Sequence, residues 1–113
     1  LTFVKDTVEG FISIAKATKL NGEVTNIGSG AEISIKELAL TIARLCKVKI
    51  KLQASPERKR PAASEVRRLF CDNSKIMKNT KWLPRYSLEQ GLLQTMNWIK
   101  QNINYYKPDL YIK

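Results

Sequence analysis

Two groups of residues in this sequence have the types and spacing to bind an anion. The first is the basic run Arg58, Lys59 and Arg60, which lies between Pro56 and Pro61. A guanidinium group is a planar fork that matches a phosphate, and flanking prolines reduce the entropy lost when such a fork is held in place. Charge runs of this kind are also common on solvated surfaces. Three interpretations therefore stay open: a plain surface, a diphosphate site or a nucleic-acid patch.

The second group is the turn from Asn26 to Gly30, in which Gly28, Ser29 and Gly30 separate a predicted strand from a predicted helix. Phosphate-binding loops occupy this place in many nucleotide-binding proteins. The turn lacks the third glycine of GxGxxG and the GK[ST] of a P-loop. It is therefore either a tight turn that needs a permissive backbone or a contact to a ligand through its amides.

Catalytic and metal-binding groups are not recognisable in the sequence. There is no histidine, which excludes His-based acid–base chemistry and most imidazole zinc sites. Cys46 and Cys71 form no CxxC pair, and we expect both to be buried thiols in a reducing compartment. We therefore expect no catalytic residue and no metal site in this chain. Four carboxylates lie at predicted helix starts, where the helix dipole favours them without any catalytic role. They are Asp6, Glu37, Asp72 and Glu89.

Composition and charge limit the class of protein. The 113 residues are 43% hydrophobic and 27% charged, as in a single globular domain. Twenty basic residues against ten acidic ones give a net charge of +10, which favours an anionic partner. No apolar run approaches the roughly 20 residues of a membrane span, and no signal peptide is recognisable. We expect a soluble, cytoplasmic protein that does not bind membranes.

Four predicted helices are among the elements that must position the basic run and the glycine turn. An apolar stripe predicts the first, over Lys5 to Lys19, and Asn21 and Gly22 are expected to end it. Capping boxes at Ser34 and Ser87, with Glu37 and Gln90 three residues later, predict the starts of two more. The remaining boundaries are a helix end at about Cys46, a short helix from Asp72 or Asn73 to about Lys81, and a last stripe of Leu88, Leu92, Met96, Ile99 and Ile103.

Alternating patterns between the helices predict strands over Glu23 to Ile27, Lys49 to Ala54 and Arg67 to Cys71. A loop is expected over Ser55 to Val66, and an irregular tail over Asn104 to Lys113. This order indicates an α/β fold with helices packed on a small sheet, over residues 1–113 as one region. Two or three strands make a thin sheet, so we expect the strand after the first helix to belong to a larger sheet outside this sequence.

Seven short segments, in order along the chain, resemble motifs of one enzyme family. Each is weak alone, but together they cover nearly the whole chain up to about Asn102. In the first half of the chain, Phe3 to Val8 is similar to YVxDxV, Glu23 to Gly30 to GEvxNIGsG, and Ser34 to Ala39 to SIkELA. Arg60 and Pro61 are similar to the RP loop. In the second half, Asp72 to Lys75 is similar to ADxSKa, Trp82 to Pro84 to GWxP, and Ser87 to Leu92 to SLEeGL. The family is that of the extended short-chain dehydrogenase/reductases, the NAD-dependent nucleotide-sugar epimerases and dehydratases.

The resemblance implies the C-terminal, substrate-binding lobe of a two-domain Rossmann-type enzyme. The family's glycine-rich NAD loop, its catalytic Thr or Ser and its YxxxK pair are not among these residues. NAD is thus expected in the full-length enzyme and not on this fragment, which we expect to be inactive alone. Residues 1–27 are expected to pack with the missing N-terminal Rossmann domain, which would leave Val8, Phe11 and Ile12 exposed here and could permit a homodimer.

The resemblance also implies three substrate-binding residues. Arg60 takes the position of the family arginine that contacts the nucleotide diphosphate, and it is also the residue that the charge pattern selects. Glu65, or its neighbour Ser64, takes the position of the residue that holds the nucleotide ribose, although Ala62 and Ala63 replace the usual glycine-containing stretch. Asn26, at the start of the glycine turn, is the third candidate.

Three functions remain. The segment Arg60 to Val66 reads RPxxSEV, which resembles the corresponding segment of 4,6-dehydratases acting on nucleotide-linked amino sugars. It favours a dehydratase over a 4-epimerase. A small basic nucleic-acid-binding module is a less favoured alternative, because the sequence contains no recognised helix-turn-helix, zinc finger or RNP motif. A structural or oligomerising domain, charged for solubility alone, is the third.

Overall fold

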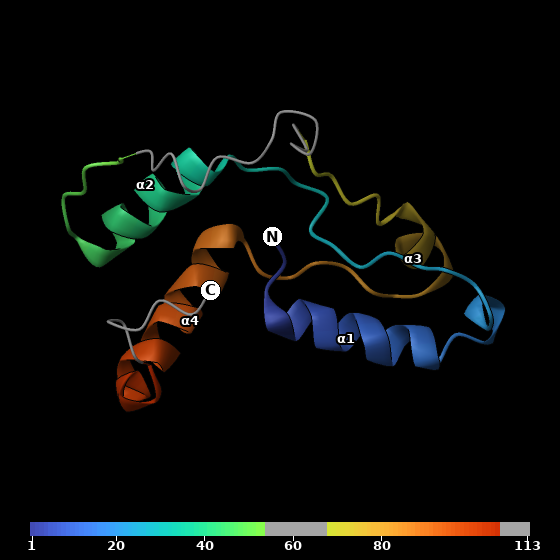
Figure 1. Ribbon diagram of the computed structural model, residues 1–113. Helices are drawn as coiled ribbons and strands as arrows, with labels where there is room; N and C mark the ends of the chain where they lie inside the picture. The colour runs from blue at the N-terminus through green and yellow to red at the C-terminus, as the bar shows by residue number, and fades with distance from the viewer. Residues whose placement is uncertain (54–67, 107–113) are drawn as a thin grey trace.

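Four α-helices and two short 3-10 helices form the described part of the chain, residues 1–53 and 68–106 of a computed structural model (Figure 1). No helix in this part is long and apolar enough to cross a membrane. The helical elements, in chain order, are α1 (Val4–Ala15), η1 (Thr18–Leu20), α2 (Ile35–Cys46), α3 (Ser74–Asn79), α4 (Leu88–Gln101) and η4 (Ile103–Tyr105).

Both predicted capping boxes are present. The Glu37 amide donates to Ser34 Oγ at 3.1 Å, and Glu37 Oε2 accepts from the Ser34 amide at 3.1 Å. At α4 the Gln90 amide donates to Ser87 Oγ at 3.2 Å, and Gln90 Oε1 accepts from the Ser87 amide at 2.9 Å. Each pair satisfies helix-terminal amides that have no partner inside the helix, and so fixes where the helix starts.

Helix ends differ from the prediction by a few residues. α1 ends at Ala15 instead of Lys19, because the chain tightens into η1 before Gly22 turns at φ +75°. α3 ends at Asn79, and α4 ends at Gln101 before η4. The predicted irregular tail therefore begins with helical residues, and its last seven residues, 107–113, lie outside the described part.

The predicted strands are wrong for the described residues. Residues 23–27, 49–53 and 68–71 carry no regular secondary structure, and no strand occurs in residues 1–53 or 68–106. Ala54, the loop over residues 55–66 and Arg67 lie outside that part. A strand exists only where its backbone pairs with another strand, and alternation in the sequence predicts the extended chain without supplying the partner. The described fold is helical.

The hydrophobic core is small. Only Leu20, Ala43, Ile76 and Trp82 are buried apolar side chains in the described part. The accessible surface is 10,099 Å², whereas a folded monomer of 12.9 kDa exposes about 6,300 Å². The radius of gyration is 17.4 Å, against about 13 Å for a compact chain of this length. The open arrangement of the helices in Figure 1 agrees with both values.

The expected apolar face of α1 is exposed. Val8, Phe11 and Ile12 are 49%, 65% and 42% exposed, which confirms the prediction for these three side chains. Both cysteines are free thiols, but the expectation of burial is wrong for Cys46, which is exposed at the end of α2, and Cys71 is half-buried.

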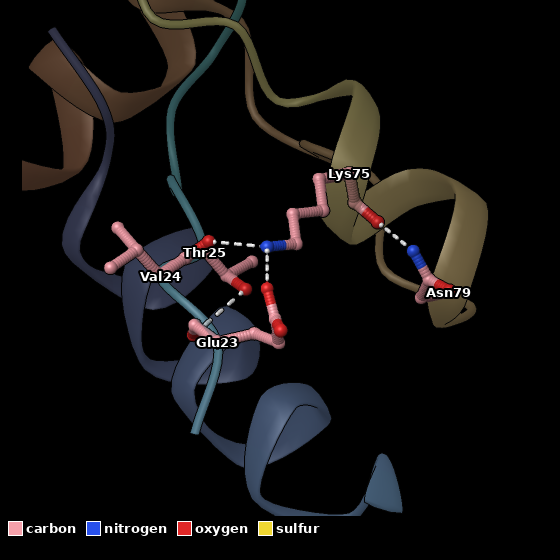
Figure 2. Close-up of polar contacts among 5 residues, drawn as sticks. All are labelled: Glu23, Val24, Thr25, Lys75 and Asn79. Atoms are coloured by element: carbon pink, nitrogen blue, oxygen red, sulfur yellow. Dashed lines mark hydrogen bonds and ion pairs between the residues drawn. The ribbon is translucent and has the colours of Figure 1, made fainter. Parts of the chain in front are cut away.

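The segment 23–28 runs between α1 and α3 (Figure 1) and makes contacts with both helices. Gly10 of α1 meets Ile27, because a Cβ at Gly10 would lie 2.8 Å from the isoleucine Cγ2. Figure 2 shows the other side, where Lys75 Nζ of α3 donates to Glu23 Oε2 at 2.9 Å and to the Val24 carbonyl at 2.7 Å. The hydrogen bond and the charge of Lys75 lower the pKa of Glu23.

Candidate functional site

A pocket of about 460 Å³ lies where the N-terminal residues, the glycine turn and the start of α4 meet. We call it the turn pocket. Residues 1–3 form one side, residues 29 and 31–33 a second, and residues 84–88 with Gly91, Leu92 and Thr95 of α4 a third. Three segments far apart in the sequence thus enclose one space, of a size typical of small-molecule sites.

Asp6 ties two sides of the turn pocket together. Its side chain is 2% exposed, and its Oδ1 and Oδ2 accept hydrogen bonds from the amides of Arg85 at 3.0 Å and Tyr86 at 3.2 Å. The indole Nε1 of Trp82 donates to the Asp6 backbone carbonyl at 2.9 Å. Both carboxylate oxygens are therefore satisfied, as a buried polar group requires. Sequence reasoning gave Asp6 only a helix-start role, since its partners lie 79 and 80 residues away.

Aromatic packing forms the apolar wall. The rings of Phe3 and Tyr86 lie 4.8 Å apart between centroids, tilted at 60°. Gly91 of α4 lies directly against Phe3, since a Cβ there would be 3.1 Å from the phenylalanine Cβ. Lys5 Nζ lies 5.9 Å from the Tyr86 ring centroid and donates to Gln94 of α4 at 3.1 Å. The glycine thus permits the N-terminal residues to pack against α4.

The rim of the turn pocket carries charge. Glu32 accepts from Arg68 Nε at 3.1 Å, and the arginine holds the pKa of Glu32 below its usual value. Arg68 is the first described residue after the segment that contains Arg60. Arg85, an exposed residue, lines the pocket itself, whereas Arg68 does not. A guanidinium at a pocket wall can pair with an anionic group of a ligand.

Only one of the three predicted ligand residues lies in the described structure, because Arg60 and Glu65 fall outside the described residues. Asn26 is exposed and does not line the turn pocket. As ligand contacts, all three stay predictions.

The glycine turn serves packing. A Cβ at Gly28 would lie 2.4 Å from Cys71 Sγ, and the Gly28 carbonyl accepts from Asn73 Nδ2 at 2.8 Å. Gly30 has φ +67°, and its open side faces the same asparagine. A dinucleotide needs glycines with free space for its pyrophosphate. The turn therefore does not fit NAD.

Both carboxylates that line the turn pocket are bonded to protein groups. Asp6 is committed to backbone amides and Glu32 to Arg68. In residues 1–53 and 68–106 no three Cys, Asp or Glu side chains gather to hold a metal ion. The pocket combines an apolar wall of Phe3 and Tyr86 with one cationic residue, Arg85, among its lining residues.

Comparison with known proteins relates this chain to nucleotide-sugar enzymes. The model of the family described as GDP-mannose 4,6 dehydratase matches residues 1–95. The chain is 34% identical over 107 residues to a UDP-glucuronate 4-epimerase of Thermodesulfobacterium geofontis, covering 94% of this chain and 31% of that protein. It is 36% identical over 102 residues to a UDP-N-acetyl-alpha-D-glucosaminuronate decarboxylase of Bacillus cytotoxicus, covering 88% and 32%. A GDP-mannose 3,5-epimerase of Arabidopsis thaliana is 31% identical over 102 residues, covering 90% and 25%.

The chain belongs to the extended short-chain dehydrogenase/reductase family of nucleotide-sugar epimerases and dehydratases. It spans between a quarter and a third of the length of these three relatives. No solved structure matches the chain.

Proposed function

We propose that this chain is the nucleotide-sugar-binding part of an NAD-dependent 4,6-dehydratase and is inactive without the rest of the enzyme. The observation that carries the proposal is the turn pocket, with Arg85 among its lining residues, inside the region that the family model matches. A 4-epimerase is the alternative. Our preference for the dehydratase rests on the resemblance of the RPxxSEV segment alone.

The chemistry of binding follows from charge. A diphosphate carries about two negative charges, and a hydrogen bond from a guanidinium to such a group contributes roughly 1.5 to 3 kcal/mol where water is partly excluded. We assign this role to Arg60, the ribose to Glu65 and a polar contact to Asn26. The net charge of +10 attracts the ligand from a distance.

We propose that the rest of the enzyme packs on the exposed apolar face of α1. The exposed face of α1 and an accessible surface well above that of a compact monomer favour a chain whose core is completed by another unit. We assign this role to an N-terminal dinucleotide-binding domain, which packs on residues 1–27, supplies the larger sheet and holds NAD. A second copy of the chain is the alternative partner. The family chemistry and the thiols are consistent with a cytoplasmic enzyme.

A nucleotide titration tests the proposal. UDP, GDP and dTDP are added to the labelled chain while its amide NMR signals are followed. One nucleotide is expected to bind saturably and to shift amides of residues 29–33 and 84–88. Arg60→Ala is expected to weaken binding by about 10- to 150-fold, whereas Arg58→Ala, a matched change in the same basic run, is expected to keep most of it. Unchanged affinity in Arg60→Ala would contradict the proposal.

A DNA duplex in the same titration tests the nucleic-acid module, which the net charge favours. Binding through phosphates weakens by about 0.9 decades per decade of salt for each phosphate contacted on duplex DNA. Salt-sensitive shifts spread over the basic surface would favour that function, and a flat response would exclude it.

A further inference from the structure

The sides of the turn pocket come from segments about eighty residues apart, and one carboxylate lies between them. Phe3 and the start of α1 form one side, and residues 84–88 form the other. We propose that Asp6 is a positioning residue: it holds the Arg85 and Tyr86 backbone against α1 and thereby sets the shape in which the turn pocket binds its ligand. That the ligand is a nucleotide sugar rests on the function proposed above.

The contacts single out the Asp6 side chain. Its two oxygens accept from two consecutive amides, at 3.0 and 3.2 Å, and these amides immediately precede Ser87, the N-cap of α4. One carboxylate therefore holds the backbone that lines the pocket and leads directly into α4. The carboxylate is 2% exposed, so water cannot take over its role at either amide without opening the contact.

The neighbouring contacts cannot replace it. The Trp82 indole bonds to the backbone carbonyl of Asp6, so this contact survives a change of the side chain. The contact between Phe3 and Tyr86 is apolar and sets no hydrogen-bond register. Loss of the carboxylate thus leaves the two sides in contact but frees the Arg85 and Tyr86 amides, which changes the pocket more than the fold.

Graded variants separate positioning from folding. Asp6→Asn keeps the size of the side chain and one acceptor oxygen, so one of the two amides keeps a partner. Asp6→Ala keeps neither. Glu9→Gln is the matched control, an exposed carboxylate one turn further along α1. For each variant, amide hydrogen exchange is measured at Arg85 and Tyr86, and nucleotide affinity is measured with UDP, GDP and dTDP.

We expect nucleotide affinity to fall in the order native, Asp6→Asn, Asp6→Ala, with at least a tenfold loss for the alanine variant. Amide exchange at Arg85 and Tyr86 is expected to rise in the same order, while the amides of α2 keep their native exchange and Glu9→Gln behaves as the native chain. If the α2 amides also lose protection in Asp6→Ala, the asparagine variant decides the question.

Two results overturn the inference, and each differs from failure of the proposed function. Native affinity in Asp6→Asn or Asp6→Ala, despite faster exchange at Arg85 and Tyr86, shows that the carboxylate does not position the ligand site. Unchanged exchange at both amides shows that it does not hold the backbone. If the native chain binds none of the three nucleotides, the proposed function fails, and the exchange at these amides still decides whether Asp6 shapes the pocket.

Discussion

Replacement of Gly28 by alanine should disrupt the turn beside the pocket. A Cβ at this position would lie 2.4 Å from Cys71 Sγ and 2.5 Å from Cys71 Cβ. The Cβ of Cys71 is fixed to its backbone, so the backbone has to move. Overpacking of this kind costs about 1 to 3 kcal/mol, and we expect Gly28→Ala to lie near 2 to 3 because two atoms are involved. The midpoint of thermal unfolding should then fall by roughly 8 to 15 °C.

Gly22 offers a matched control. It has φ +75° and no atom within 4 Å of the added Cβ, so Gly22→Ala carries only backbone strain, about 1 to 2 kcal/mol. Urea unfolding of both variants, and of Gly28→Ala combined with Cys71→Gly, measures the difference. In the double variant we expect the losses to be at least about 1 kcal/mol less than additive, since both crowded atoms are removed. Simple additivity, or a smaller effect at Gly28 than at Gly22, would refute this packing argument.

Two further predictions concern the α1–α3 region. Because Lys75 lowers the pKa of Glu23, the stability from this contact is present above the usual glutamate pKa of about 4.3 and is lost as pH falls through the lowered pKa. The urea midpoint of the native chain should therefore drop between pH 7 and pH 3, and the drop should be smaller in Lys75→Met. Equal drops in the two proteins would exclude this contact as the cause. The second prediction concerns the apolar face of α1, where Phe11 is 65% exposed, against 46% for Leu40 on α2. Phe11→Ser should therefore reduce hydrophobic-dye binding, and self-association measured by sedimentation of the isolated chain, more than Leu40→Ser does. Equal effects of the two substitutions would argue against α1 as the main docking face.

Local signals in the sequence predicted the helix starts correctly. A capping box needs only two residues three positions apart, so Ser34 with Glu37 and Ser87 with Gln90 could be recognised without any tertiary information. The strand predictions failed in the described residues because a strand needs a partner strand, and a local pattern does not supply that partner. Alternation over residues 23–27 indicates a chain with two different sides, and here Ile27 meets α1 while Lys75 bonds the backbone at Val24.

The candidate site was only partly predictable. The glycine turn and the basic run stand out by composition, and the structure places Ser29 at the turn pocket. The role of Asp6 was missed because its partners are backbone amides, which carry no residue signature, nearly eighty residues away. Gly91 was missed for a related reason, since only the packing of Phe3 against it reveals why a side chain does not fit there.

The long separation between Asp6 and its partners sets the order in which the chain can fold during synthesis. The contacts to Trp82, Arg85 and Tyr86 close loops of 76, 79 and 80 residues. At about 5 to 20 residues per second, the ribosome needs roughly 4 to 16 s after making Asp6 to produce these partners. Through that interval α1 has neither its C-terminal anchor nor the turn pocket beside it. On the proposal that an N-terminal domain packs on residues 1–27, that domain would meet α1 first, before the loop closes.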